Sequence, residues 1–374
     1  MTPRLTRRTV LQGGALSALG LLVAACGGDD SGSADTSSPS TSPSTDAPST
    51  TTASSEVATT TGVTNTTTGG PTTTVAAGPV YPLTGMPIDD ETRALRPAMV
   101  VKIDNHPQAR PQFGLNRADI VFEENVESLT RFAVVLQSQD AERVGPVRSG
   151  RTQDIDLLGS FDKPLFVWSG GNANVTRAIN GSDLVNLSPT TTKNDGFFRE
   201  NRAGEDSEHT LYARPLDLYA EFTPVYAPAP PQQFTYRAAD EAFNGESATG
   251  ADVKMDGGVQ VNWAWDTASA TYLRSMNGKA HNDAELGQVN AANVVVLEVE
   301  YRPSPADSRS PEAQTVGTGA AYVFTSGVLV RGTWTREDRL KPFQLLDEDG
   351  QVIGLTPGRT WVELARVGTT TPTT

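Results

Sequence analysis

Residues 27–80 constrain the fold of this 374-residue chain more than any other feature, because they cannot contribute to a packed core. The segment consists almost wholly of Ser, Thr, Gly, Ala, Pro and Asp, and it contains no aromatic residue, lysine or arginine. Such a composition buries too little apolar surface to offset the loss of chain entropy, so we expect a disordered tether. Folding should therefore begin near Tyr81, and a short disordered tail is expected at 368–374.

The residues before the tether, 1–26, have the features of a lipoprotein signal peptide. Arg4, Arg7 and Arg8 precede a weakly apolar stretch, which ends in Val-Ala-Ala immediately before Cys26. Small residues before a cysteine form a lipobox, in which the thiol accepts a diacylglyceryl group, and several acyl chains on one residue give stable membrane attachment. We therefore expect anchoring in the cell membrane through lipid on Cys26, with the folded part on the extracytoplasmic face.

The segment Thr6–Gln12 also resembles a twin-arginine export motif. The glycine content and modest hydrophobicity of the following stretch fit that route, although adjacent arginines also occur in ordinary secretion signals. Export by this route would mean that the protein folds before it crosses the membrane.

Charge and cysteine content argue against several functional classes. The formal net charge is −14, and removal of a signal with three arginines and no acidic residue lowers it to about −17. This balance argues against non-specific nucleic-acid binding. Cys26 is the one cysteine, so neither an intrachain disulfide nor a cysteine metal cluster can form. We predict no metal and no cofactor.

Residues 81–225 are predicted to form an N-terminal α/β-type domain, because strand and helix patterns alternate along them. Strands are expected at 98–104, 120–124, 132–137 and 165–168, and helices at 149–161 and 173–179.

Residues 226–232 are rich in proline and predict a stiff connector between two domains. Beyond it, 233–367 should form a β-rich C-terminal domain, with Asp349-Gly350 at a hairpin turn. The predicted fold class is therefore α+β. Strands are expected at 259–265, 270–274, 294–301, 320–324, 328–334, 344–346, 352–355 and 361–364.

Asp104, Asn105 and His106 follow the end of a predicted strand, where α/β proteins commonly bind ligands. A carboxylate beside an imidazole could perform acid–base catalysis or bind a metal. The alternative is a capped turn in which His106 faces solvent.

Arg148 and Arg151 flank Ser149, which precedes a helical pattern and is a candidate N-cap. Two guanidinium groups beside a helix N-terminus would form an anion site for phosphate or carboxylate. The alternative is a structural network in which the arginines pair with Glu123, Glu124 or Glu127. The complete set of candidate site residues is Asp104, Asn105, His106, Glu127, Arg131, Arg148, Ser149 and Arg151.

His281 and Asp283 form a secondary candidate, with an imidazole and a carboxylate from one loop. The alternative is a polar hairpin. The three histidines of the chain show none of the spacings of a zinc hydrolase.

Several motifs together resemble the YerB-like family of bacterial lipoproteins, a two-part domain of unknown function. The resemblance covers essentially all of 81–367 and implies an envelope lipoprotein with an N-terminal and a C-terminal domain and no settled activity. It supplies no catalytic residues to transfer to this chain. The matching motifs are 82–87, 103–106, 109–112, 114–115, 118–121, Glu127 with 130–132, 145–149 with Arg151, 281–283, 293–295, 332–334 and 357–361.

Two functions are compatible with these features. The first is a non-catalytic envelope protein that binds a wall component or an envelope protein partner, which fits the tether and the lack of a complete catalytic constellation. The second is an envelope hydrolase acting on a glycan, peptide or phosphate ester. Its acid–base groups would be Asp104, His106 and Glu127, with Arg148 and Arg151 holding an anion. The hydrolase requires these five side chains to converge in one cleft.

Overall fold

The structure, a computed structural model, describes residues 78–374 except 203, 227, 239, 240 and 242, and all of these residues lie in one compact unit. The predicted signal peptide, Cys26 and the tether up to residue 77 lie outside the described residues. Within the part that the structure describes, no helix is both long and apolar enough to cross a membrane.

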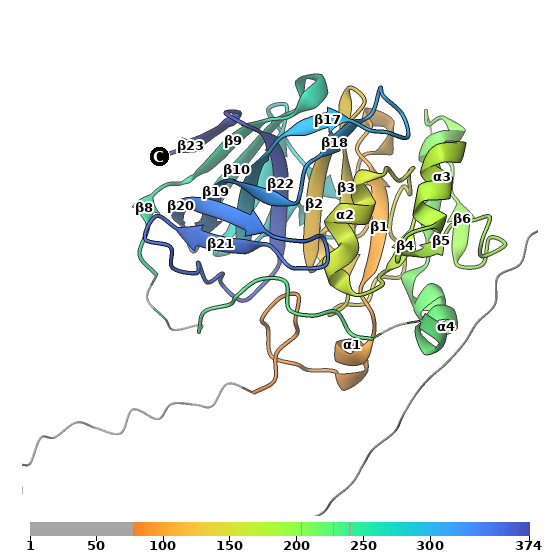
Figure 1. Cartoon of the computed structure of the whole chain (residues 1–374), viewed down its shortest axis with the longest axis horizontal. Coiled ribbons are helices and arrows are strands. Elements are labelled where there is room, and N and C mark those ends of the chain that lie inside the picture. Colours follow the sequence, from red (N-terminus) through yellow and green to blue (C-terminus); the bar gives the residue numbers. More distant parts are fainter. Residues whose placement is uncertain (1–77, 203, 227, 239–240, 242) are drawn as a thin grey trace, which may run out of the picture. The chain divides into compact units, whose positions relative to one another are not determined.

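A mixed eleven-stranded sheet runs through the described part of the chain (Figure 1). Its strand order is β21-β20-β19-β16-β22-β2-β3-β1-β4-β5, and β8 pairs with β20. The strands are β1 Met99–Asp104, β2 Ile120–Val126, β3 Leu129–Leu136, β4 Leu165–Val167, β5 Val185–Leu187, β8 Glu246–Ser247, β16 Asn293–Val299, β19 Gly317–Thr325, β20 Val328–Arg336, β21 Gln344–Asp347 and β22 Thr360–Arg366.

Strand β22 joins the two halves of the chain, because it lies between β2 and β16 and runs parallel to both. Val362 of β22 pairs with Phe122 on one side and Val295 on the other. The segments 81–225 and 233–367 therefore contribute to one sheet. The first residue of the connector predicted at 226–232, Tyr226, is the last residue of helix α4, Pro215–Tyr226.

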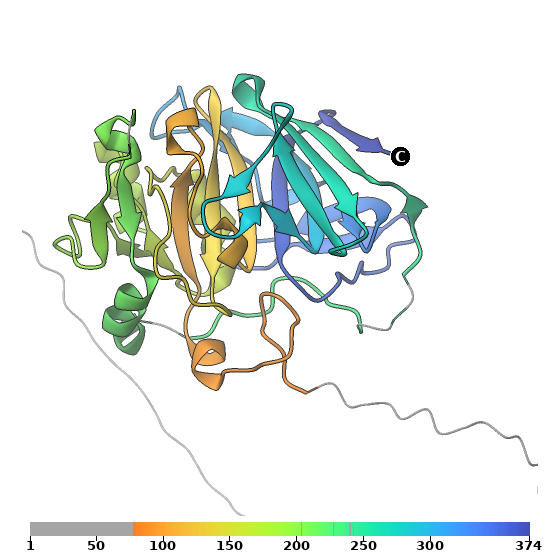
Figure 2. The ribbon, with the colours of Figure 1, turned by 180° about the vertical axis from the view of Figure 1, so that it is seen from behind.

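A second sheet of six strands covers one face of the first, and its strands are seen in front in Figure 2. Its order is β12-β11-β10-β9-β23, with β15 beside β11. These strands are β9 Gly250–Lys254, β10 Gln260–Asp266, β11 Thr271–Met276, β12 Lys279–Ala280, β15 Asn290–Ala291 and β23 Thr370–Thr373. Three hairpins complete the β-structure: β6 Phe197–Arg199 with β7 Leu211–Ala213, β13 Asn282–Asp283 with β14 Gly287–Gln288, and β17 Tyr301–Pro303 with β18 Pro311–Ala313.

The helices are short, and α2 packs on the sheet face opposite the second sheet (Figures 1 and 2). The α-helices are α1 Glu91–Leu95, α2 Gln153–Leu158, α3 Ala173–Asn180 and α4 Pro215–Tyr226. The 3₁₀ turns are η1 Pro107–Ala109, η2 Leu115–Arg117, η3 Gly159–Phe161, η4 Ser207–His209 and η5 Asp256–Gly258.

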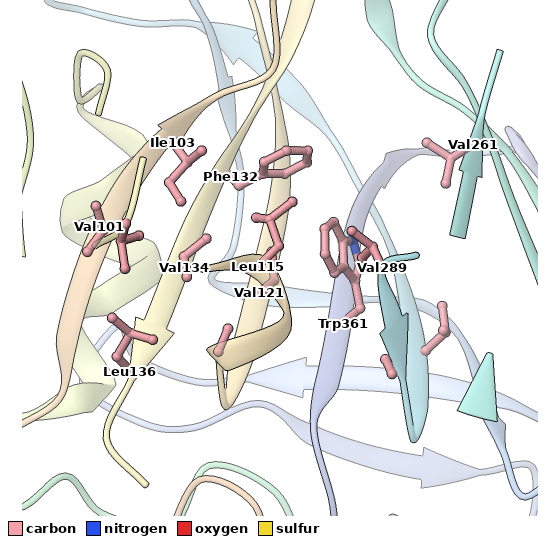
Figure 3. Packing of buried hydrophobic residues seen from close by; sticks show 14 of the residues in the cluster. Val101, Ile103, Leu115, Val121, Phe132, Val134, Leu136, Val261, Val289 and Trp361 are labelled. Atoms are coloured by element: carbon pink, nitrogen blue, oxygen red, sulfur yellow. The ribbon is translucent and has the colours of Figure 1, made fainter. Parts of the chain in front are cut away.

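The central strands have an apolar core on each face, because side chains alternate along a strand. Val101 and Ile103 of β1 join the core between the two sheets, together with Trp361 of β22 (Figure 3). Val100, between them in sequence, joins the second core with Leu157 of α2. Covering both faces explains why β1 is buried throughout, in contrast to the alternating pattern of a half-exposed strand.

The predicted α+β class is confirmed. Each predicted strand overlaps an observed strand or isolated bridges, and its ends differ from those of the observed strand by at most three residues. The helix predicted at 149–161 was too long. It begins only at Gln153 and continues as η3, so Ser149 is not its N-cap. The reason is that the backbone of Arg148 bonds to the neighbouring strands: its N–H donates to Lys102 O, and its carbonyl accepts from Ser169 N.

The tail predicted to be disordered at 368–374 is instead largely strand β23, which pairs with β9 along Gly250–Val253. Without this partner β9 would be an edge strand with unpaired backbone groups, and a run of threonines has suitable β-propensity. The folded part also starts slightly before Tyr81, since Val80 pairs with Pro87.

Candidate functional site

A cleft of about 970 Å³ lies where segments from both halves of the chain meet. Its walls come from the β2–β3 turn, residues 149–151, the loop before α3, the β17–β18 hairpin and the end of β22. The lining is mostly polar. Its members include Glu127, Ser128, Ser149, Arg151, Ser169, Asn172, Asp256, Tyr301, Arg302, Asp307, Arg309, Ser310 and Arg366.

Glu127 and Arg151, both predicted site residues, form a bidentate ion pair in the cleft wall. Arg151 Nε donates to Glu127 Oε1 at 2.9 Å and Nη2 donates to Oε2 at 2.6 Å. Ser310 Oγ donates to the same carboxylate. Burial raises the pKa of Glu127, but the hydrogen bonds from Arg151 and Ser310 outweigh this effect and lower the pKa to about 2. A carboxylate of this pKa is a poor proton carrier near neutral pH, so Glu127 serves as an anchor for Arg151.

The β17–β18 hairpin is bonded to the N-terminal half beside the cleft. Thr152 Oγ1 lies 2.6 Å from Ser304 Oγ, and it also donates to Glu312. Gln153 Oε1 accepts from the backbone N–H of Ala313 at 2.8 Å. These bonds join two segments that are about 150 residues apart in sequence and lie next to residues of the cleft lining.

A separate group surrounds His209 and consists of Asp104, His106 and Arg148. None of these four residues lines the cleft. Asp104 Oδ2 accepts from His209 Nδ1 at 2.7 Å and lies 3.1 Å from Arg148 Nε. Asp104 Oδ1 accepts from the backbone N–H of His106 at 2.9 Å. The two imidazole rings stack, with centroids 4.4 Å apart and an interplanar angle of 5°. Arg148 also pairs with Glu208.

Sequence reasoning missed His209, which η4 brings to Asp104 from 105 residues away. No motif surrounds it. The one available signal was the scarcity of histidine, since a chain with three histidines uses two of them in this pair.

Arg131 lies between the cleft and the histidine pair. It is the β3 residue directly opposite Asp104 on β1, and its Nη1 donates to the backbone carbonyl of Ser149 at 2.9 Å. Only 8% of its surface is exposed. Burial is the main cause that lowers the pKa of Arg131, and the nearby positive charge of Arg151 adds to the effect. The pKa falls to about 10, so the guanidinium remains charged at neutral pH.

Beneath this region, Lys102 is buried against two carboxylates on the α2 face of the sheet. Its Nζ lies 2.8 Å from Asp154 Oδ1 and also contacts Glu124. Burial lowers the pKa of Lys102 to about 8. Asp154 also accepts from the backbone N–H of Arg151 at 2.7 Å, which positions that arginine for the cleft.

Asn105 belongs to a different, fully buried network between the two sheets. Its Nδ2 donates to Thr130 Oγ1 at 2.7 Å, and Thr130 donates to Glu123 Oε1 at 2.7 Å. Arg274 of the second sheet donates to the other oxygen of Glu123 at 2.5 Å. Asn105 therefore holds the two sheets together and does not face the candidate site.

His281 and Asp283 do not act together. His281 is buried, and burial with the nearby Arg274 holds its pKa well below the usual range. Its Nε2 lies 2.8 Å from Gln112 Oε1. Asp283 Oδ1 instead accepts from the backbone N–H groups of Glu285 and Leu286, as expected for the polar hairpin β13–β14. No group of three or more metal-binding side chains occurs among the described residues.

Comparison with known proteins gives two consecutive family matches. Residues 83–225 match the model described as the N-terminal domain of a "Protein of unknown function (DUF3048)", and residues 251–362 match its C-terminal domain. The predicted connector at 226–232 lies between the two matches.

One relative and one solved structure agree with this match. The chain is 28% identical over 300 residues to the protein named "Putative lipoprotein YerB" of Bacillus subtilis (strain 168), covering 76% of this chain and 85% of the relative. The crystal structure of the YerB protein from Bacillus subtilis is similar with a TM-score of 0.68 and 24% identity, over 79% of this chain and 99% of that chain. This second likeness shows the fold alone.

Proposed function

This chain belongs to the DUF3048 family of proteins of unknown function, and we propose that it is a lipid-anchored cell-envelope protein whose cleft binds a polar component of the wall. The lipobox at Cys26 and the composition of residues 27–77 support the anchoring, together with the name of the Bacillus subtilis relative. The anchor would place the folded part on the extracytoplasmic face, and the arginine pair at Arg7-Arg8 supports export by the twin-arginine route.

The observation that carries the binding proposal is the cleft of about 970 Å³, because its volume and polar lining suit a hydrophilic ligand. Tyr301 is the one aromatic residue in the lining. Its hydroxyl donates to Leu364 O at 2.7 Å, and Arg366 covers its ring at 4.7 Å from the centroid. Recognition would therefore use hydrogen bonds and charge rather than stacking on an aromatic ring.

The charges in the cleft are prearranged in pairs. Glu127 holds Arg151, and Asp256 holds Arg366 through bonds of 2.6 and 2.7 Å. Paired guanidinium groups are held in fixed positions and keep further N–H donors for a ligand. Such an arrangement favours a ligand with hydroxyl, amide and acidic groups over an apolar one.

A second candidate, an envelope hydrolase, is favoured by one observation, the hydrogen bond between Asp104 and His209. Because Nδ1 faces the carboxylate, Nε2 is the ring nitrogen that acid–base chemistry would use. The five side chains required by that hypothesis are divided between the cleft and the histidine pair, however, so binding without catalysis is the better-supported function.

The binding proposal is tested by calorimetric titration of the full chain, carrying Cys26→Ser to keep it in solution, with soluble wall fragments. We expect binding in the micromolar range. Arg151→Ala should weaken it about tenfold or more by removing a charge-assisted bond. The matched control is Arg331→Ala, which removes a surface arginine paired with Glu246 at 2.8 Å and remote from the cleft lining. No heat of binding, or equal affinity for both variants, would contradict the proposal.

The hydrolase is tested in the same samples by product analysis of the wall fragments. Cleavage that disappears in His209→Gln would favour it over simple binding, whereas intact fragments would remove its support.

A further inference from the structure

Lys102 is the one buried lysine in the part of the chain that the structure describes, and its side chain ends between two carboxyl groups. Its Nζ lies 2.8 Å from Asp154 Oδ1 and also contacts Glu124. The side chains of all three residues are 0% exposed. None of the three lines the cleft, so the proposed binding function does not explain why an amine and two carboxyl groups meet here.

The fold of the sheet brings Lys102 of β1 and Glu124 of β2 together over a small residue of the strand between them. Ala133 of β3 is directly opposite Lys102, and on its other side it pairs with Phe122. Glu124 lies two residues beyond Phe122 and is therefore on the same face of the sheet. The short side chain of Ala133 leaves room for the amine to reach across. Helix α2 packs on this face and supplies Asp154 from its first turn (Figure 1).

The surroundings favour the neutral amine of Lys102. Burial lowers the pKa of Lys102 to about 8 despite the opposing carboxylate of Asp154. The positive charges of Arg131 and Arg151 add to the lowering. Near neutral pH such a lysine is uncharged in a far larger fraction of molecules than an exposed lysine, and the uncharged amine is the nucleophile.

Asp154 is held so that its Cγ can be attacked. Its Oδ2 accepts from the backbone N–H of Arg151 at 2.7 Å, while Oδ1 faces Lys102 Nζ at 2.8 Å. A C–O bond is about 1.2 Å long, so Nζ lies within about 4 Å of Cγ. Reacting atoms in a productive arrangement are about 3–3.5 Å apart, so rotation of the side chains is sufficient to bring them together. The Arg151 N–H would stabilise the negative charge that develops on Oδ2 during attack.

Glu124 is placed to carry a proton between the two groups. It contacts Lys102 Nζ, and its Oε2 is buried without a hydrogen-bond partner in the described part of the chain. A carboxyl group in contact with an attacking amine can accept the proton that the amine loses and then deliver it to the departing oxygen.

We infer that Lys102 and Asp154 become joined by an amide bond that the folded protein forms by itself, with Glu124 as the proton carrier. Nζ of the neutral amine attacks Cγ of Asp154 protonated on Oδ1, and the Nζ–Cγ bond forms. Glu124 takes one proton from Nζ and delivers it to Oδ1. The Cγ–Oδ1 bond then breaks, its electron pair stays with the oxygen, and the oxygen leaves as water.

Loss of water suits this buried position. Before the reaction the group holds two positive and two negative charges, which belong to Lys102, Arg131, Glu124 and Asp154. Afterwards Arg131 and Glu124 still balance each other, and two fewer charges remain in the interior, where charges are costly. The exclusion of water also favours the amide over its hydrolysis.

The bond would give the folded part a covalent cross-link that it cannot obtain from cysteine, since Cys26 is the one cysteine of the chain. It would join β1 to α2 between residues that are 52 positions apart. Arg151, whose backbone N–H is bonded to Asp154, lines the cleft, so the cross-link would lie directly behind that wall.

The test is mass spectrometry of the denatured full chain carrying Cys26→Ser, which keeps it free of lipid. The amide link makes the chain lighter than its own sequence by the mass of one water molecule. Because an Asp-Gly step such as Asp349-Gly350 can also lose water, the link is located by tryptic digestion. We expect the peptides that contain Lys102 and Asp154 to be recovered as one branched species.

Two matched variants test the role of Glu124. Glu124→Gln keeps the size of the side chain but cannot carry the proton, so bond formation should slow about a hundredfold or more. The freshly purified variant should then yield mainly separate peptides. Glu123→Gln is the control, because Glu123 is an equally buried neighbour that pairs with Arg274 of the other sheet. It should carry the link in full.

Each outcome bears on one part of the inference and none depends on wall binding. Separate, unmodified peptides from the unsubstituted chain would overturn the bond. A branched peptide that joins Lys102 to Glu124 would overturn the choice of Asp154. A link that forms equally fast in Glu124→Gln would overturn the role of Glu124. If Glu124→Gln does not fold, the peptides of the unsubstituted chain still decide whether the bond exists.

Discussion

Arg151 and Glu127 meet through two parallel hydrogen bonds in the wall of the cleft, one from Nε at 2.9 Å and one from Nη2 at 2.6 Å. The β2–β3 turn supplies the carboxylate, and the segment before α2 supplies the guanidinium. The carboxylate of Glu127 holds the guanidinium group of Arg151 in position. In return, the hydrogen bonds from Arg151 lower the pKa of Glu127 and keep it ionised. Both residues belong to the sequence motifs that resemble the YerB-like family, and both line the proposed binding surface.

Glu127→Gln should destabilise the protein in a pH-dependent manner. The pKa of Glu127 is lowered to about 2 in the folded state from an ordinary value of 4.5. Its contribution is therefore complete above pH 4.5 and is lost as the pH falls towards 2. Because the side chain is 38% exposed, we expect a loss of only about 1 kcal/mol at pH 7. Urea unfolding at pH 7 and pH 3 measures it.

The control for that variant is Glu246→Gln, which breaks an exposed pair with Arg331. Its effect should stay below about 0.5 kcal/mol at both pH values. A Glu127→Gln loss that is as large at pH 3 as at pH 7 would contradict the assigned role.

Glu363→Gln should stabilise the protein at high pH. Burial and the neighbouring Glu123 hold the pKa of Glu363 well above 4.5. Folding therefore favours the protonated form, so stability is greatest below pH 4.5 and falls as the pH rises towards the folded-state value. Glutamine keeps an acceptor for the Trp263 Nε1–H bond of 2.9 Å but cannot ionise. A gain of about 1 kcal/mol at pH 8, with little change at pH 4, is expected in urea unfolding.

Glu123→Gln provides the contrast to Glu363→Gln, since it removes the ion-pair partner of the fully buried Arg274. We expect it to cost about 3 kcal/mol at pH 7, because breaking one side of a buried pair leaves the other charge unmatched. Equal effects of the two substitutions would contradict the ion pair of Glu123 with Arg274 and the raised pKa of Glu363.

Asp104→Asn should lower stability by about 3 kcal/mol, because it leaves Arg148 and the buried His209 without their shared carboxylate. Thermal unfolding measures the loss. His106→Ala is the matched comparison, since this ring is only partly buried and contacts His209 by stacking, and its cost should be about 1 kcal/mol. A larger loss for His106→Ala would contradict the arrangement of the pair.

Deletion of residues 368–374 should expose the edge of β9. We expect a loss of about 1–2 kcal/mol and greater self-association, because β9 would lose its hydrogen-bonded neighbour β23. Thr374→Ala, at the chain end beyond β23, is the control and should have no effect. Light scattering and urea unfolding measure the two quantities, and an unchanged truncated protein would contradict the pairing.

The elements that the sequence predicted well are those defined by local pattern. The apolar run at 98–104 and the turn at Asp349-Gly350 depend on neighbouring residues alone. Strands β1 and β21 are present there, and Leu346 of β21 forms an isolated bridge with Val352 across the turn. The parallel pairing of β2 with β22 joins residues about 240 apart, and nothing local specifies it. This pairing is why two segments of distinct pattern form one sheet.

The candidate site, like the fold, could be predicted from the sequence only in part. Glu127, Ser149 and Arg151 lie together in the cleft as the motif density suggested, whereas Asp104 and His106 lie outside its lining. Sequence could not separate these groups, because Asp104 is bonded to His209, which lies 105 residues away and belongs to no recognisable motif.

The most direct test of the central claim is photo-crosslinking in living cells with p-benzoylphenylalanine in place of Ser308, an exposed residue of the cleft lining. Leu340, which is 52% exposed and outside the cleft, is the control position. We predict that wall polymer is captured from position 308 and not from position 340. Equal capture at both positions, or none at position 308, would contradict the assignment of this cleft as the binding site.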